Sequence, residues 1–149
     1  MKNINGDLHN ILKIAPIINE IFFKSFHKSY EIPHGLNKTH IKTLLFLNFE
    51  GSCPMNLLSK KVNLEKGSFT PVAEKLINIG YLEKVKFPND KRKSLLQLTP
   101  LGDEFITNHR NKHLSYVRSI LSKLDENERE TYLSAIRLVL STSKKLLDD

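Results

Sequence analysis

Apolar residues near the start of the chain recur at helical spacing, which places them on one face of a helix. That face comprises Leu8, Ile11, Leu12, Ala15, Ile18 and Phe22. Pro16 falls inside the stretch, so we expect it either to kink the helix or to mark its first turn. An apolar stripe of this length needs another apolar surface to cover it.

Two shorter helices are predicted next. Asn37 is a typical N-cap for a helix that carries apolar residues at helical spacing as far as the break at Gly51. A third helix is expected over Met55 to Lys61, with Leu57 and Leu58 facing the core.

A fourth helix is predicted from near Gly67 to about Asn78, where Gly80 can end it as a left-handed cap. Its buried face would hold Phe69, Val72, Leu76 and Ile77. Two short helices joined by a tight turn form a helix-turn-helix candidate, and we call the fourth helix the reader helix.

The period of apolar residues changes from helical to alternating after Gly80. Strands are predicted over Tyr81–Phe87 and Ser94–Leu98, and Pro88–Asp90 has the composition of the turn between them. This β-hairpin is called the wing below.

Two longer helices complete the pattern. Thr99 and Pro100 are typical of a helix start, and the apolar stripe that follows continues to Asp125. Asp125 to Glu128 resembles a capping box that opens the last helix.

This order of elements predicts a mainly α-helical fold with a small β-hairpin wing, a winged helix-turn-helix with N- and C-terminal dimerisation helices. Residues 33–100 would form the winged-helix unit, and residues 1–32 and 101–149 the dimerisation helices. The winged-helix unit cannot cover the apolar stripes of the terminal helices alone, so we expect helices of two copies to pair in a homodimer.

Charge narrows the choice of partner. The 149 residues are 40% hydrophobic and carry a net charge of +7, which indicates a folded protein and favours nucleic acid over a membrane surface as its acidic partner. Cys53 to Leu98 holds nine Lys or Arg against four Asp or Glu, so much of the basic excess lies in the winged-helix unit. The sequence therefore favours double-stranded DNA as the partner of this unit.

Several classes of protein are disfavoured. Apolar runs fall well short of the roughly 20 residues that span a membrane, and Met1–Asp7 lacks a signal-peptide pattern, so we expect a cytoplasmic protein with no membrane partner. Cys53 is the only cysteine, which excludes an intrachain disulfide. The sequence has no Gly-rich phosphate loop and no nucleophile elbow, so neither an enzyme nor a cofactor is expected.

Four segments of the chain resemble the MarR (multiple antibiotic resistance regulator) family in spacing and order. They are Leu64–Pro71, Leu76–Leu82, Asn89–Ser94 and Leu98–Gly102. The Gly-Ser-Phe-Thr-Pro run is most similar to the organic-hydroperoxide-sensing branch, but the first helix has no cysteine, so peroxide sensing is not carried over. The resemblance implies a sequence-specific transcription regulator, a repressor released by a small-molecule effector.

Two groups of residues are predicted to contact DNA. A helix fits the major groove, so a homodimer would place two reader helices on a pseudo-palindromic operator. The reader-helix residues are Lys66, Gly67, Ser68, Thr70, Pro71 and Lys75. The wing residues are Lys84, Lys86, Asp90, Lys91, Arg92 and Lys93.

Arg92 is the expected minor-groove contact, because a narrow groove concentrates negative potential that attracts arginine. The Asp-x-Arg signature of the resembling family implies that Asp90 holds the wing tip in shape. A basic turn or a lysine-rich helix face can also be a solvated surface without a ligand. The two groups of residues therefore indicate DNA binding mainly because they occur together.

The family resemblance places an effector pocket near five residues, which also fit a core. They are Phe22, Phe26, His27, Tyr30 and His40. An alternative is a metal-responsive regulator, since His109 and His113 lie four residues apart and His27, His34 or His40 could complete a site. We favour a packing role for His109 and His113 and expect no metal.

Two further alternatives stay open. Cys53 is either a buried residue at a helix start, which we favour, or a redox sensor. The whole winged helix could also be a module that binds an acidic protein.

Overall fold

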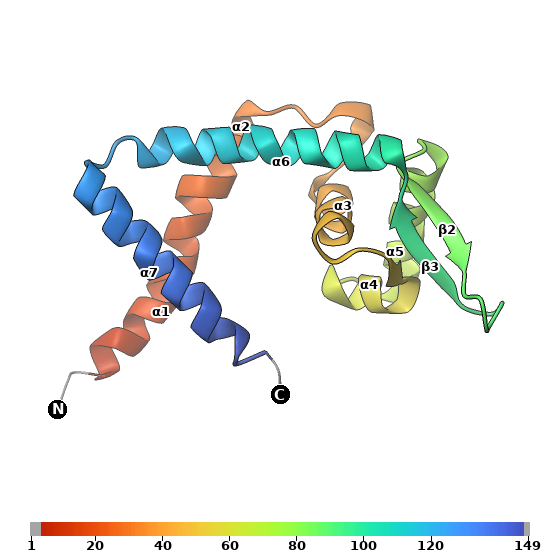
Figure 1. Cartoon of the computed structure of the whole chain (residues 1–149), viewed down its shortest axis with the longest axis horizontal. Coiled ribbons are helices and arrows are strands. Elements are labelled where there is room, and N and C mark those ends of the chain that lie inside the picture. The colour runs from red at the N-terminus through yellow and green to blue at the C-terminus, as the bar shows by residue number, and fades with distance from the viewer. Residues whose placement is uncertain (1–3, 148–149) are drawn as a thin grey trace. The chain divides into compact units, whose positions relative to one another are not determined.

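The computed structural model describes residues 4–147, which are mainly helical with one small sheet (Figure 1). The elements in chain order are α1 (Ile4–Asn19), the π-helical turn η1 (Glu20–Lys24), α2 (Ser25–Ser29), the 3-10 turn η2 (Pro33–Gly35), α3 (Lys38–Glu50), β1 (Cys53–Pro54), α4 (Met55–Lys61), α5 (Lys66–Asn78), β2 (Leu82–Lys86), β3 (Ser94–Leu98), α6 (Pro100–Leu121) and α7 (Glu126–Lys144). The predicted fold class is confirmed, and α5 is the reader helix.

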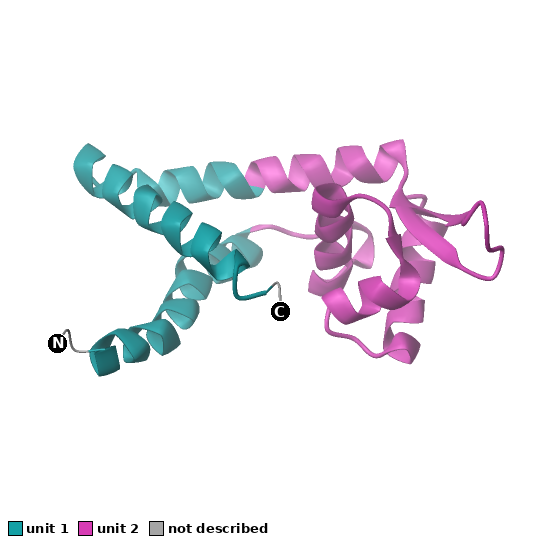
Figure 2. Ribbon diagram, turned by 60° about the horizontal axis from the view of Figure 1, so that its bottom comes forward, with its two compact units in different colours: residues 1–29, 113–149 teal, residues 30–112 magenta. Residues whose placement is uncertain are grey.

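The chain divides into two compact units (Figure 2). Residues 30–112 form the winged-helix unit, and residues 1–29 with 113–149 form the terminal unit. The sequence had placed the second boundary near residue 100. The structure assigns the first half of α6 to the winged-helix unit, because Phe105 and Ile106 pack against that unit's hydrophobic core.

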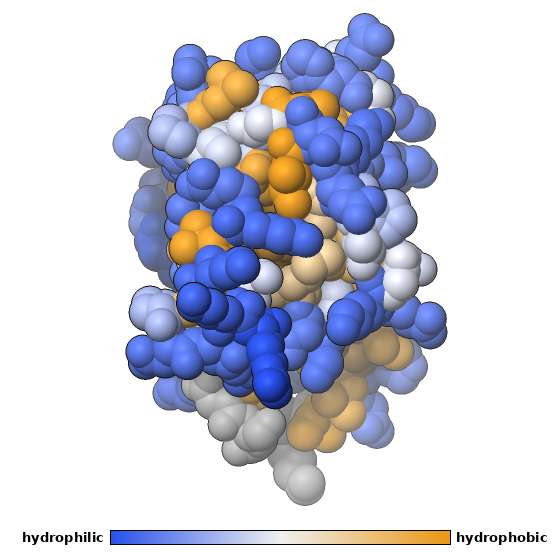
Figure 3. Space-filling model, turned by 90° about the vertical axis from the view of Figure 1, so that its right-hand side faces the viewer, coloured by the Kyte–Doolittle hydropathy of each residue, from blue (hydrophilic) through white to orange (hydrophobic). Residues whose placement is uncertain are grey.

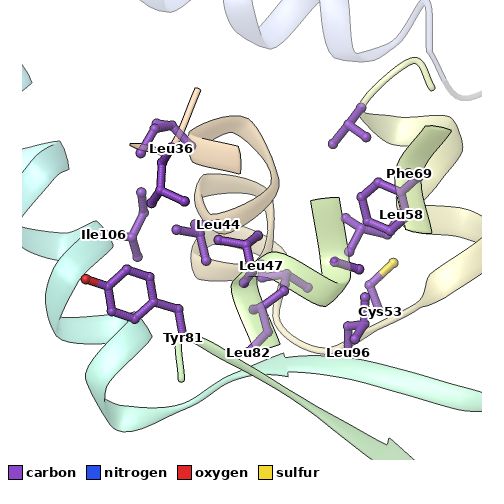
Figure 4. Close-up of a cluster of buried hydrophobic side chains, with 14 residues drawn as sticks. Leu36, Leu44, Leu47, Cys53, Leu58, Phe69, Tyr81, Leu82, Leu96 and Ile106 are labelled. Carbon is purple, nitrogen blue, oxygen red and sulfur yellow. The ribbon is translucent and has the colours of Figure 1, made fainter. Parts of the chain in front are cut away.

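The core of the winged-helix unit is contributed by α3, α4, α5, α6 and the sheet (Figure 4). Its fully buried side chains include Leu44, Leu58, Phe69, Leu76 and Leu96. Each such side chain stabilises the fold by about 1.5 to 3 kcal/mol relative to an exposed position. The prediction that Leu57 faces the core is wrong, because a helical residue next to buried Leu58 points about 100° away, and Leu57 is 42% exposed.

The sheet has the strand order β1-β3-β2, all antiparallel. The wing pairs Leu82 with Leu98 at its base and Lys86 with Ser94 near its tip. β1 was not predicted, since two residues that include a proline cannot show alternation. Its Cys53 lies opposite Leu96.

The junction between the wing and α6 shows why Thr99 and Gly102 occur in the Leu-Thr-Pro-Leu-Gly run. The Thr99 hydroxyl donates to the Gly80 carbonyl at 2.5 Å and accepts from the Gly102 N–H at 3.0 Å. Gly80 has a φ of +85°, which confirms its left-handed conformation. A Cβ on Gly102 would overlap the carbonyl group of Tyr81, so only glycine allows α6 to start this close to the strand.

In the terminal unit, α1 begins at Ile4 and contains Pro16, so Pro16 does not mark the helix start. Beyond α1 the helix widens into η1. There Tyr116 and His113 of α6 contact the carbonyl oxygens of Ile21 and Phe22, at 3.1 Å and 2.6 Å. A π-helical turn frees carbonyl groups of this kind, and partners from a second helix satisfy them.

The N-caps predicted at Asn37 and Asp125 are present. Asn37 forms a capping box with His40 at α3, and Asp125 forms one with Glu128 at α7. Within residues 4–147, the structure contains no helix with the length and apolar character needed to cross a membrane.

Candidate DNA-binding surface

One face of α5 is buried and the opposite face is open. Phe69, Ala73 and Leu76 pack into the core. Four exposed positions form a stripe at helical spacing, which we call the reading stripe: Gly67, Pro71, Glu74 and Asn78. Ser68 is exposed beside it, and Thr70 is half-buried. A smooth stripe without bulky side chains at its N-terminal end allows the backbone to approach a groove closely.

The start of α5 carries Lys66, which is exposed. The Thr70 hydroxyl donates to the Lys66 carbonyl at 3.0 Å, so this hydroxyl is engaged within the helix. Pro71 has no N–H to offer the Gly67 carbonyl, and the helix nevertheless continues to Asn78. The helix start therefore presents an exposed lysine, and Pro71 cannot donate to the Gly67 carbonyl at this end.

The wing tip has a defined shape. Asp90 accepts a hydrogen bond from the Arg92 backbone N–H at 3.0 Å, and the Lys93 N–H donates to the Asp90 carbonyl at 3.2 Å. The Arg92 guanidinium is exposed beyond this turn. The Asp-x-Arg signature implies that Asp90 holds the wing tip in shape. Asp90 does so here through the backbone N–H of Arg92.

A cleft of about 490 Å³ lies between the start of α5 and the tip end of the wing. Its basic residues are Lys66, Arg92 and Lys93, and its lining contains no acidic residue. The remaining lining residues are Pro54, Met55, Asn56, Phe87 and Ser94. A concave site with three cationic groups favours an anionic group such as a backbone phosphate.

The side of the molecule that carries the wing is largely polar (Figure 3). Lys84, Lys86 and Lys91 are all exposed on the wing. On β2, the carboxylate of Glu83 accepts from the Gln97 amide at 2.6 Å, so this acid is held against the neighbouring strand. The wing therefore presents its lysines to solvent.

Lys75 differs from the other predicted DNA-contacting lysines. It is half-buried, and its ammonium donates to the Gly35 carbonyl at 2.7 Å. This contact holds α5 to the η2 turn and leaves fewer donors for a phosphate.

Sequence reasoning missed Glu74 and Asn78. The sequence prediction considered mainly basic residues and small residues at the helix start. Glu74 and Asn78 nevertheless lie on the reading stripe. Asparagine pairs with adenine and a carboxylate accepts from the cytosine amino group, so these side chains suit base recognition. The signal was present in the sequence, as both are polar and seven and eleven residues beyond Gly67.

The five predicted pocket residues fall in both units. In the terminal unit, Phe22 and Phe26 are buried, and Phe26 stacks on His113 with ring centroids 4.2 Å apart. His27 lies 6.0 Å from His113 between ring centroids. Phe22 also lines a cleft of about 520 Å³ with Tyr116.

In the winged-helix unit, Tyr30 meets His109 edge to face at 5.0 Å. His40 is 5% exposed, and its Nδ1 accepts the Asn37 N–H at 3.0 Å, so its ring serves the α3 cap. Burial, followed by the positive charge of Lys75, lowers the pKa of His40 below 6.5.

His109 and His113 each pack against aromatic rings, as the packing interpretation expects. Among residues 4–147, no three His, Cys, Asp or Glu side chains come together as a group that could hold a metal ion. Cys53 is buried, and burial raises the pKa of its thiol despite the opposing charge of Lys61. The burial and the raised pKa of the Cys53 thiol weigh against a redox sensor at this position.

Known proteins share this arrangement. The model of the MarR family matches residues 36–94. The transcriptional regulator MhqR of Bacillus subtilis (strain 168) is 31% identical over 74% of this chain and 73% of its own length. The multiple antibiotic resistance protein MarR of Salmonella typhimurium (strain LT2) is 31% identical over 68% and 72%.

A solved structure of BpsR from Bordetella bronchiseptica has the same fold. It covers 89% of this chain and 98% of its own, with a TM-score of 0.58 and 20% identity, and concerns regulation of its DNA binding by 6-hydroxynicotinic acid. The winged helix, its wing motif and the two curated relatives agree: the chain belongs to the MarR family of helix-turn-helix transcriptional regulators.

Proposed function

We propose that this regulator binds a pseudo-palindromic duplex as a homodimer and acts as a repressor that a small effector releases. Each α5 would enter a major groove with its reading stripe, and each Arg92 would enter the flanking minor groove. Two copies of α5 would then lie about 34 to 36 Å apart, one turn of B-DNA. The protein would act in the cytoplasm.

The observation that carries the DNA-binding proposal is the cleft that joins Lys66, Arg92 and Lys93. Helix start and wing are far apart in sequence, yet their cationic side chains line one concave surface. Such a surface can follow a phosphate backbone between a major and a minor groove.

Exposed apolar surface supports the homodimer. The terminal unit presents large apolar side chains on α1 and α7, namely Leu8 (53%), Ile11 (65%), Leu12 (75%), Leu138 (67%) and Leu140 (57%). Exposed apolar side chains in this number are typical of a protein interface.

The effector site is proposed in the terminal unit. Support comes from the cleft lined by Phe22 and Tyr116, which suits a molecule with an apolar body, and from the likeness to BpsR, whose DNA binding 6-hydroxynicotinic acid regulates. Release requires that the effector bind better to the form of the protein that does not fit DNA.

Fluorescence anisotropy with duplexes from the region upstream of the chain's own gene tests the DNA-binding role. Arg92→Ala should weaken binding at least about fivefold, since a base-edge or groove arginine contributes roughly 1 to 3 kcal/mol. Arg118→Ala is the matched control, because Arg118 is exposed on α6 in the terminal unit and its loss should leave affinity unchanged. Equal affinities for the two variants would contradict the proposed surface.

A further inference from the structure

Lys75 holds two segments of the winged-helix unit together. Its ammonium lies 2.7 Å from the carbonyl oxygen of Gly35, although the two residues are 40 positions apart in sequence. Lys75 is half-buried on α5, beside the reading stripe rather than on it. A charge-assisted hydrogen bond of this kind is stronger than a neutral one.

The partner turn is unusual. His34 and Gly35 both have left-handed backbones, with φ of +61° and +63°. The Leu36 N–H closes the turn on the Pro33 carbonyl at 3.3 Å. A non-glycine residue in this conformation costs free energy, so surrounding contacts must hold the turn in shape.

Lys75 also interacts electrostatically with His40. After burial, the positive charge of Lys75 lowers the pKa of His40, whose unprotonated Nδ1 accepts the Asn37 N–H in the α3 cap. The lysine therefore interacts with the η2 turn through a hydrogen bond and with the α3 cap through its charge.

We propose that Lys75 is a positioning residue, which fixes the reader helix to the Pro33–Gly35 turn, and is not a phosphate contact. The inference rests on the proposed DNA-binding function and deepens it, since the lysine would act on DNA only through the placement of α5. It also separates Lys75 from Lys66, which lies exposed in the cationic cleft at the start of the same helix.

The first measurement needs no DNA, so it tests the contact even if the DNA-binding proposal fails. In the full-length protein, Lys75→Met should speed amide hydrogen exchange at Leu36 and raise the pKa of His40 in an NMR titration. Lys75→Arg, which keeps a charged donor, should restore both values. Exchange and titration unchanged in Lys75→Met would overturn the proposal.

The second measurement separates positioning from phosphate contact through salt. A phosphate contact contributes about 0.9 to the slope of log K against log salt, or about 1.8 for two subunits. Lys75→Met should weaken binding to a selected genomic duplex about two- to tenfold, the range of one hydrogen bond, with the slope unchanged. Lys66→Met, the matched control, should lower the slope.

A lower slope for Lys75→Met would assign Lys75 to a phosphate and overturn the proposal, as would unchanged affinity. Wild-type protein that binds no duplex would instead remove the proposed function, while the exchange and titration results would still decide whether Lys75 holds the turn.

Discussion

The buried side chain of His40 makes the stability of the α3 cap depend on pH. Its Nδ1 must be unprotonated to accept the Asn37 N–H, while Asn37 Oδ1 accepts from the backbone of Thr39 and of His40 itself. A proton on Nδ1 would break the capping box and place a positive charge near Lys75. Burial and that charge keep the pKa of His40 below its usual 6.5.

The first prediction follows from the lowered pKa. As pH falls, the unfolded chain binds a proton at His40 before the folded protein does, so the free energy of unfolding is at its full value above pH 6.5 and declines as pH falls below it. Urea denaturation between pH 5 and pH 8 measures this decline. His40→Gln should be less stable near neutral pH but should show a flatter decline.

His9→Gln is the control for that experiment, because His9 is exposed on α1. It should follow the wild-type dependence on pH. A His40→Gln protein whose stability falls as steeply as that of wild type would rule out His40 as a source of the dependence.

At the scale of elements, Gly67 and Gly102 both lie in the first turn of a helix but differ in the space around them. Gly102→Ala should lower the free energy of unfolding by about 1 to 3 kcal/mol, because the added Cβ overlaps the Tyr81 carbonyl at the start of α6. Gly67→Ala should be neutral or stabilising by up to about 1 kcal/mol, because nothing lies within 4 Å and alanine favours helix. Thermal and urea unfolding compare them, and similar losses would contradict this packing.

The wing offers a test of how Asp90 acts. Asp90→Ala removes the acceptor for the Arg92 N–H and should weaken DNA binding about three- to tenfold, the range of one hydrogen bond. Asp90→Asn keeps an acceptor oxygen and should bind nearly as well as wild type in the same anisotropy assay. Equal losses would mean that the charge of Asp90 matters, and not its hydrogen bond.

The sequence predicted most elements because local signals agreed with the fold. α4 and β3 have the predicted bounds, and α5 begins one residue earlier than expected. η1 could not be predicted, because its freed carbonyl groups are satisfied by His113 and Tyr116 from a helix about 90 residues later. Such partners are invisible to local periodicity.

The candidate site was predictable in type but not in detail. Basic residues at a helix start and a wing tip indicate a DNA-binding surface, and the structure brings Lys66, Arg92 and Lys93 around one cleft. Lys75 illustrates the limit, since charge alone cannot show that its ammonium meets the Gly35 carbonyl. Glu74 is the opposite case: its negative charge did not indicate a DNA contact, yet it lies on the exposed reading stripe.

At the scale of the whole molecule, the proposed function requires two copies of the chain to pair. Leu12→Glu should shift the dimer towards monomer in sedimentation equilibrium, because Leu12 is 75% exposed on α1 and a buried carboxylate would oppose association. Lys13→Glu is the neighbouring control and should stay dimeric if Lys13 lies outside the interface. A wild-type chain that is monomeric at micromolar concentration would contradict the pairing.

The most direct test of the central claim is a hydroxyl-radical footprint of the wild-type protein on a duplex selected from genomic DNA. We predict two protected segments related by a dyad and centred about 10 base pairs apart. Protection of the flanking minor grooves should be lost in Arg92→Ala while the central segments remain. Protection without sequence preference, or an identical footprint for Arg92→Ala, would contradict the account.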